Sequence, residues 1–374
     1  MHRRLVALFI VTSFLTGAKA EGLSAAEQLD RALPRVMRSE KTPGLSAAVV
    51  RGGKVVWAKA YGFADVAKRV RTTTDTAFML ASVSKTVTAT AMMQLVDDGK
   101  VGLDAPIDPY LPFTVRNPRF PRIPITVRML LTHTSSIADG PHSDDNYVPG
   151  DSPVSLETFL AGYFTPGGPS YHAENFLEER PGDAYEYSNE ATALIGLLVQ
   201  RIAGRSFESF CADRIFQPLG MSSTSWRLAG LDPSKVALPY DYDPATRRYE
   251  SYGHYGYPDI PNGALRTTAP QLAKFLLMFM NRGVYDGRRI LKAATVDAMR
   301  RPQVPDLEPG QGLIWFSTEL GGRELIGHDG SDSGVSTAMY YEPETGIGVI
   351  VLANGDGEGA EAALARILQL AHLL

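Results

Sequence analysis

Ser82 and Lys85 are the residues whose types and spacing point most directly to chemistry. They open the stretch SVSKTVTATAMMQL, and the pattern predicts a helix over residues 82–98. A serine hydroxyl becomes a good nucleophile only when a neighbouring base takes its proton. Residues three apart lie on one face of a helix, so Lys85 would contact Ser82 and, with its pKa lowered by burial, serve as that base. Because an S-x-x-K match arises by chance about once in a chain of this length, the pair needs support from elsewhere in the sequence.

Two later stretches carry the other polar residues of a candidate site. In residues 181–204, Tyr187 and Asn189 come directly before a helical pattern that ends at a glycine, within PGDAYEYSNEATALIGLLVQRIAG. Residues 327–334 read GHDGSDSG and lie on or beside a late strand. The candidate residues of that strand are His328, Gly330 and Ser331. The sequence therefore offers three short motifs far apart in the chain.

In their order and context, these motifs resemble the signature elements of the serine β-lactamase and penicillin-recognising superfamily, whose class A members carry S-x-x-K, S-D-N and K-T-G. Here the middle element is Y-x-N and the last is H-x-G, which is similar to the branch with class C β-lactamases, DD-carboxypeptidases, D-aminopeptidases and β-lactamase-like esterases. Further segments that resemble the family, in the family's order, are LVDDGKVGLDAPIDPYLP (95–112), ITVRMLLTHTSSI (125–137), IFQPLGMSSTSW (215–226) and NGALRTTAPQLAKFLLMFMN (262–281). The resemblance covers nearly the whole mature chain.

The resemblance implies a catalytic role for three residues. Ser82 would form an acyl-enzyme, and Lys85 and Tyr187 would share the work of the general base. Tyr187, as a phenolate or a hydrogen-bonded phenol, would relay the proton to the leaving group. Asn189 would bind the amide of the substrate and hold Lys85.

The resemblance also implies a substrate-binding strand edge. The N–H groups of Ser82 and Ser331 would form the oxyanion hole, and Gly330 would let the substrate backbone approach closely. His328 would stand where β-lactamases carry a lysine. Because a neutral histidine attracts a substrate carboxylate less than a lysine does, this difference favours peptidase, amidase or esterase activity over β-lactamase activity.

Two further positions depart from the family's pattern. Ala81 stands where the family often has a glycine, and Ser136 replaces the usual glycine of an H-T-S-G loop. In the same loop, His133 is expected to stabilise a turn rather than to act as an acid or a base. We expect the change at Ser136 to do no more than shift that turn.

Strand patterns lie near both ends of the chain, and helical patterns lie between them. Gly52-Gly53 joins two strand patterns as a two-residue hairpin, and a second meander covers residues 324–354. A capping box at Ser24 begins a first helix, in which Pro34 should cause a kink or a break. A closing helix is expected from about residue 358 to residue 373.

This order of elements predicts an α/β fold, with an antiparallel sheet flanked by N- and C-terminal helices and an inserted all-α domain, as in β-lactamases and transpeptidases. We place the sheet domain at residues 21–80 and 265–374, and the helical insertion at 81–264. Within the insertion, residues 138–183 read as a long, ordered irregular loop that covers the site. Trp315 is expected in the core.

Residues 1–20 read as a signal peptide. A basic MHRR segment, the apolar run LVALFIVTSFLTG and an Ala-Lys-Ala cleavage site follow one another, so the mature chain would begin at Glu21. The alternative is an uncleaved anchor helix, but the apolar run falls short of the ~20 residues that span a bilayer. We therefore expect an exported protein, periplasmic or secreted, without a stable membrane anchor after cleavage.

The net charge, the spacing of the histidines and the cysteine count indicate which ligands and partners to expect. The formal net charge of −4 argues against nucleic-acid binding, which requires a basic patch. No pair of histidines has metal-ligand spacing, so we expect neither a metal nor a cofactor. The single cysteine, Cys211, excludes an internal disulfide. The expected partner is a small-molecule or peptide substrate, and the oligomeric state is left open.

The leading hypothesis is an exported serine hydrolase that acts through an acyl-Ser82 intermediate on an amide or ester. A D-amino-acid peptide fits an envelope location, as for a DD-peptidase or an aminopeptidase. The alternatives are a β-lactamase-like esterase or weak β-lactamase, and a non-catalytic penicillin-binding or peptidoglycan-binding module. Tyr187 and Asn189 argue against the last, because such a module needs no machinery for turnover.

Overall fold

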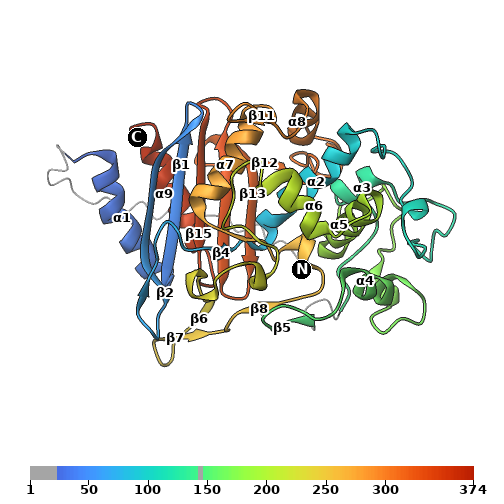
Figure 1. Cartoon of the computed structure of the whole chain (residues 1–374), viewed down its shortest axis with the longest axis horizontal. Helices are drawn as coiled ribbons and strands as arrows, with labels where there is room; N and C mark the ends of the chain where they lie inside the picture. Colours follow the sequence, from blue (N-terminus) through green and yellow to red (C-terminus); the bar gives the residue numbers. More distant parts are fainter. Residues whose placement is uncertain (1–22, 142–145) are drawn as a thin grey trace.

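The computed structural model describes residues 23–141 and 146–374. The expected signal peptide and its cleavage site lie outside the described residues. A large antiparallel sheet with helices on both faces stands beside a group of helices (Figure 1). Within the described ranges, no helix is both long and apolar enough to cross a bilayer.

The main sheet joins the two ends of the chain. Its strand order is β12-β13-β14-β15-β1-β2-β3, and the early strand β1 pairs with the late strand β15 from Leu45–Ala353 to Arg51–Ile347. The strands are β1 (Gly44–Arg51), β2 (Lys54–Asp65), β3 (Val70–Arg71), β12 (Phe316–Leu320), β13 (Arg323–Asp332), β14 (Val335–Glu342) and β15 (Ile347–Ala353). Gly52 and Gly53 connect β1 and β2 with φ of 58° and 79°, which confirms the expected two-residue hairpin.

Helices α1 (Ala25–Ser39) and α9 (Gly359–Ala371) pack together on one face of the sheet. The expected capping box is present, since Ser24 Oγ accepts from Glu27 N–H and Glu27 accepts from Ser24 N–H. Pro34 lies inside α1 and does not break it, contrary to one of the two expected outcomes. The helix buries Leu29, Leu33 and Met37, and this packing offsets the ~3 kcal/mol that an interior proline costs.

The opposite face of the sheet is covered by α7 (Ala269–Met280) and merges with the larger apolar core. Trp315 is fully buried there, and its ring stacks on Phe279 with the ring centroids 3.6 Å apart and the planes at 6°. This confirms the expected core position of Trp315.

The remaining helices form the group beside the sheet (Figure 1). They are α2 (Ser84–Asp97), α3 (Val127–Leu131), α4 (Leu156–Phe164), α5 (Asn189–Ala203), α6 (Phe207–Cys211) and α8 (Ala293–Arg300). Outside the main sheet, short two-stranded ribbons pair β4 (Phe78–Met79) with β9 (Arg266–Thr267), β5 (Val148–Pro149) with β8 (Tyr255–Gly256), β6 (Tyr240–Asp243) with β7 (Arg248–Ser251), and β10 (Val284–Tyr285) with β11 (Arg288–Arg289).

The segment 138–183 is less irregular than expected, because it contains α4. Ser155 Oγ caps this helix by accepting from Thr158 N–H at 3.0 Å. Leu156, Phe159 and Leu160 then face the core, together with Tyr163 one turn later. This i, i+3, i+4, i+7 spacing is the amphipathic pattern of a helix, so the expectation of a continuous loop was wrong.

Candidate active site

Ser82 lies in a short 3₁₀ helix, η1 (Ala81–Val83), that leads into α2. The helix expected from residue 82 therefore begins with a tighter turn, as helix N-termini often do. Ala81 has a left-handed φ of 46°, which an alanine adopts only with strain. Ser82 keeps part of its surface exposed between the buried residues Ala81 and Val83. The turn thus presents the hydroxyl-bearing residue at the surface of an otherwise buried segment.

Lys85 is fully buried, and its ammonium nitrogen makes three hydrogen bonds. Nζ donates to Ser82 Oγ at 3.0 Å, to Asn189 Oδ1 at 2.6 Å and to Asn262 O at 2.9 Å. Burial lowers the pKa of Lys85 to about 8, although the nearby carboxylates of Asp139 and Asp259 act in the opposite direction. The lysine is therefore close to the protonation equilibrium that a base at neutral pH requires.

Tyr187 lies against the same ammonium group. The Lys85 nitrogen is 5.0 Å from the centre of the Tyr187 ring. The centres of the His133 and Tyr187 rings are 4.5 Å apart. Removal of the hydroxyl from water raises the pKa of Tyr187 well above its ordinary value, while a hydrogen bond with Ser82 opposes this change. Tyr187 is therefore a neutral phenol at physiological pH.

Strand β13 closes the site opposite α2. A Cβ added to Gly330 would lie 2.9 Å from Ser82 N and 2.4 Å from Leu80 O, so only glycine lets the strand come this close. Ser331 follows on the exposed side of the strand. His328 is 2% exposed, and its ring lies between those of Tyr187, at 6.2 Å, and Phe316, at 5.1 Å. The structure thus brings all seven candidate residues to one place. The side chain of His328 is almost fully buried there.

Asp139 is a residue of this site that the sequence reasoning missed. Its Oδ1 accepts from Ser188 Oγ at 3.0 Å and from the N–H groups of Asn189 at 2.8 Å and Glu190 at 3.2 Å. Its Oδ2 accepts from Asn189 Nδ2 at 2.8 Å. This last bond fixes the amide so that Oδ1 of Asn189 faces Lys85. A carboxylate at the N-terminus of α5 also suits the helix dipole.

The turn before Asp139 holds the segment that carries Tyr187. His133 O accepts from Glu186 N–H at 2.8 Å, and His133 Nδ1 accepts from Ser188 N–H at 3.2 Å. Ser136 O accepts from Leu177 N–H at 3.0 Å. His133 and Ser136 both have left-handed φ values, 56° and 64°. His133 thus has the turn-forming position expected of it, and it also supports Tyr187.

Ser136 does more than replace a glycine. Its buried hydroxyl donates to Glu179 O at 2.6 Å and accepts from Asn117 Nδ2 at 2.6 Å. These bonds tie the turn to two other segments, which offsets the strain of its left-handed backbone.

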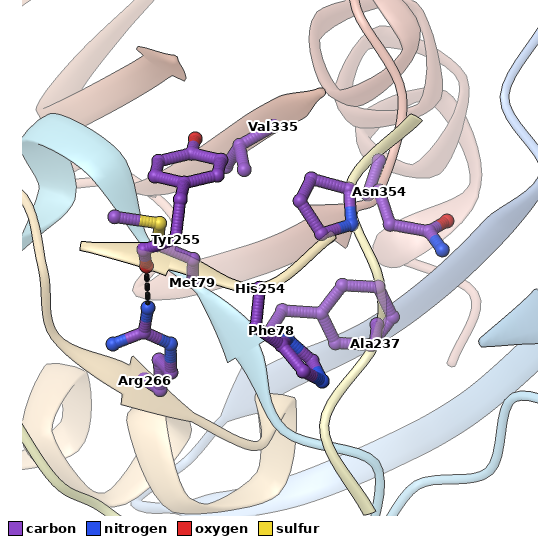
Figure 2. A pocket seen from close by; sticks show the side chains of 10 residues that line it. Phe78, Met79, Ala237, His254, Tyr255, Arg266, Val335 and Asn354 are labelled. Atoms are coloured by element: carbon purple, nitrogen blue, oxygen red, sulfur yellow. Dashed lines mark hydrogen bonds between the residues drawn. The ribbon is translucent and has the colours of Figure 1, made fainter. Parts of the chain in front are cut away.

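A small pocket close to this site is distinct from it (Figure 2). Its lining comes from β4, β8, β9, the start of β14, the end of β15 and the neighbouring loops, and it includes Met79, Tyr255 and Arg266. The candidate catalytic residues do not line it.

A family model described as Beta-lactamase matches residues 29–374. The chain belongs to the β-lactamase family. Penicillin-binding protein 4 of Amycolatopsis lactamdurans is 29% identical over 309 residues, which cover 76% of this chain and 74% of that protein. Protein flp of Staphylococcus aureus is 24% identical over 337 residues, and the match covers 89% of this chain but only 64% of flp. The resemblance expected from the three motifs is thus confirmed.

Solved structures agree with this family assignment. A penicillin-binding protein from Bacillus halodurans matches 91% of this chain and 99% of its own, with a TM-score of 0.73 and 26% identity. The D-amino acid amidase of Ochrobactrum anthropi SV3 matches 92% of this chain and 99% of its own, with a TM-score of 0.74 and 24% identity. At this lower identity, the amidase shows the fold alone. The expected β-lactamase/transpeptidase-like fold is confirmed.

The bonds of Ser136 predict a stability effect. Replacing Ser136 by alanine removes two buried hydrogen bonds, although Asn117 Nδ2 still donates to Leu177 O at 2.8 Å. At about 0.5–1.5 kcal/mol for each bond, the free energy of unfolding should fall by about 1–3 kcal/mol. Urea unfolding followed by circular dichroism measures this loss. Ser135→Ala is the control, because that hydroxyl accepts from Ile137 N–H at a longer 3.4 Å. Equal stability of the two variants would contradict the bridging role of Ser136.

The charge of Asp139 predicts a change in the titration of Lys85. In the wild type, NMR of lysine labelled at Cε should give Lys85 a pKa of about 8. In Asp139→Asn this pKa should fall, because the variant lacks a negative charge that stabilises the ammonium form. Asp30→Asn, on α1, removes an equal charge and should leave the titration of Lys85 unchanged. An unchanged pKa in Asp139→Asn would show that this carboxylate does not act on Lys85.

Proposed function

We propose that this chain is a serine hydrolase that forms an acyl-enzyme at Ser82 and transfers the acyl group to water. The observation that carries the proposal is the 3.0 Å contact between Ser82 Oγ and a buried lysine whose pKa is lowered to about 8. A lysine with an ordinary pKa holds its proton at neutral pH and cannot accept another. Lys85 loses this proton easily because burial disfavours its charged form.

The geometry supports a division of labour between Lys85 and Tyr187. Neutral Lys85 takes the proton of Ser82 as Oγ attacks the carbonyl carbon of the substrate. Tyr187 remains a phenol, so it can donate its proton to the leaving group and recover one from Lys85. In the second half of the reaction, water attacks the acyl group, gives up a proton through the same residues, and releases Ser82.

The remaining candidate residues support the carbonyl group and the acyl chain. The N–H groups of Ser82 and Ser331 are the proposed donors to the developing oxyanion, and each such donor typically contributes about 2.7–4 kcal/mol to the transition state. Asn189 is the proposed partner of a substrate amide. Asp139 holds the orientation of its side chain.

We propose D-amino-acid amides and peptides as the substrate class. The likeness to penicillin-binding proteins supports this choice, as does His328 at a position where β-lactamases carry a lysine. A weakly discriminating esterase has the same acylation chemistry and differs only in the leaving group.

Intact-mass spectrometry tests the acyl-enzyme directly. The mature protein is mixed with benzylpenicillin or with D-alanine p-nitroanilide and sampled from seconds to hours. The expected result is a covalent adduct, or turnover, in the wild type and neither in Ser82→Ala. Tyr187→Phe should still bind but turn over about 10²- to 10⁴-fold more slowly, because it lacks the proton relay. Turnover by Ser82→Ala at the wild-type rate would overturn the proposal, and binding without any acylation would favour a non-catalytic module.

We also propose export to the periplasm or beyond the cell, which the signal-peptide pattern of residues 1–20 supports. Expression of the full chain in a bacterium, followed by sequencing of the N-terminus of the exported protein, should give Glu21 as the first residue. Retention of Met1 on a protein that stays inside the cell would contradict this proposal.

A further inference from the structure

Asp332 ends strand β13 on the same face of the strand as the site residues. Alternate residues of a strand share a face, so His328, Gly330 and Asp332 point the same way. His328 lies near Tyr187, and Gly330 lies against Ser82. At about 3.3 Å per residue, Asp332 stands roughly 7 Å beyond Gly330, on the side away from His328. The serine therefore lies between a histidine and a carboxylate.

A second set of contacts places Asp332 close to the nucleophile. The hydroxyl of Tyr257, a residue only 2% exposed, donates to Asp332 Oδ2 at 3.2 Å. The same hydroxyl lies against Gly263, where an added Cβ would be 2.4 Å from it and 3.6 Å from the carbonyl carbon of Ala81. Tyr257 and Gly263 thus link Asp332 to the turn that carries Ser82, and the charge of Asp332 acts on Lys85.

Neutral donors, rather than a cation, surround the Asp332 carboxylate. Oδ1 accepts from Ser333 N–H at 2.7 Å and from Tyr147 Oη at 2.9 Å. The hydroxyls of Tyr257 and Tyr255 also interact with this carboxyl group. These bonds fix the carboxyl group and favour its charged form, against burial, which raises the pKa of Asp332 above its ordinary value.

No lysine or arginine forms an ion pair with Asp332 within residues 23–141 and 146–374. The buried Arg266 is close enough to interact with Asp332, but its guanidinium donates to Tyr255 O (Figure 2) and to Ala264 O. The charge of Asp332 acts on Lys85 in the site as well as on Arg266.

Aromatic rings complete the surroundings. The ring of Tyr147 lies 5.3 Å from that of Tyr255 and 5.0 Å from that of Tyr257, and Tyr147 is 37% exposed. The hydroxyl of Tyr255 donates to Ser333 O at 2.8 Å, which keeps its ring beside the end of β13. A fixed carboxylate beside aromatic rings is suited to an alkylammonium, which is attracted by both.

We propose that Asp332, with Tyr147 and Tyr257, binds a free ammonium group of the substrate while Ser82 attacks the carbonyl. This inference rests on the proposed hydrolase function and names its substrate class: aminoacyl amides or esters with an unblocked amine. An α-amino nitrogen is two bonds from the carbonyl carbon, so the two groups of one small substrate can reach Asp332 and Ser82 together. Asp332 should not strengthen the binding of N-acylated compounds, which lack the ammonium charge, or of compounds whose only charge is a carboxylate.

The test compares a substrate that has a free ammonium group with the same substrate after N-acetylation, which removes the positive charge. kcat/KM is measured for D-alanine p-nitroanilide and for its N-acetyl form, with the wild type, Asp332→Asn and Asp329→Asn. The wild type should prefer the free amine, and Asp332→Asn should reduce that preference at least about tenfold, since a hydrogen bond to a charged group is lost. Asp329 is the matched control: it is an exposed carboxylate on the opposite face of the same strand. Its charge acts on Tyr187, so its removal should change the rates with both substrates alike and leave the preference unchanged.

Each alternative result has a defined meaning. If Asp332→Asn lowers both rates equally, Asp332 only holds Tyr147 and Tyr257 in place and the proposal is wrong. It is also wrong if the wild type does not distinguish the two substrates.

Binding without turnover separates this inference from the proposed function. Calorimetry on Ser82→Ala compares D-alanine amide with N-acetyl-D-alanine amide. Tighter binding of the free amine supports the ammonium site even if the wild type hydrolyses neither substrate. Equal binding overturns it even if hydrolysis is confirmed.

Discussion

The burial of the Lys85 ammonium group is the constraint on which the rest of the site depends. A charged nitrogen removed from water costs several kcal/mol unless polar partners surround it. Here the three acceptors come from Ser82, from Asn189, which is 104 residues away, and from the carbonyl of Asn262, which is 177 residues away. The chain must therefore bring α2, α5 and the segment before β9 to one point, or leave a charge unpaired in the core.

Each acceptor is itself held in place by a carboxylate or by the sheet. Asp139 orients Asn189, and the side chain of Asp259 accepts from Asn262 Nδ2. The same carboxylates raise the pKa of Lys85 against the larger effect of burial, so they set how easily the lysine loses its proton. Burial shifts the pKa of Lys85 down and that of Tyr187 up. Because the two shifts are opposite, the neutral lysine and the neutral phenol are compatible at physiological pH. Protonated Lys85 can then return a proton to Tyr187 once the phenol has given its own proton to the leaving group.

Local signals made much of the fold predictable. Gly204, with φ of 67°, ends α5, so the expected glycine stop is where the structure has it, and Ser188 caps the other end of the helix. The strand β12 was missed, although Gly321-Gly322 links it to β13 with φ of 61° and 77°, the same two-glycine signal that identified the first hairpin. The helix α4 was missed because glycines and prolines around it obscured its apolar spacing.

The supporting residues of the site were not predictable in the same way. Asp139 acts on residues about 50 positions later in the chain, and the proximity of Asp332 to Ser82 depends on Tyr257 and Gly263. No local pattern encodes such pairings. The motif residues could be recognised because Ser82 and Lys85 interact within one helical turn, whereas the groups that set their protonation come from elsewhere in the fold.

The contact between β13 and η1 explains how the site tolerates backbone strain. Ala81 has a left-handed φ, which costs an alanine roughly 1–2 kcal/mol. The turn cannot relax, because Gly330 lies against Leu80 O and Ser82 N, and Thr337 Oγ1 on β14 donates to Leu80 O at 2.6 Å. The paired strands of the sheet thus hold the turn from one side, while Lys85 holds it from the other through its bond to Ser82. The position of Ser82 consequently depends on the pairing of the strands in the main sheet. The strained backbone of Ala81 persists because the sheet and Lys85 both hold the turn in this conformation.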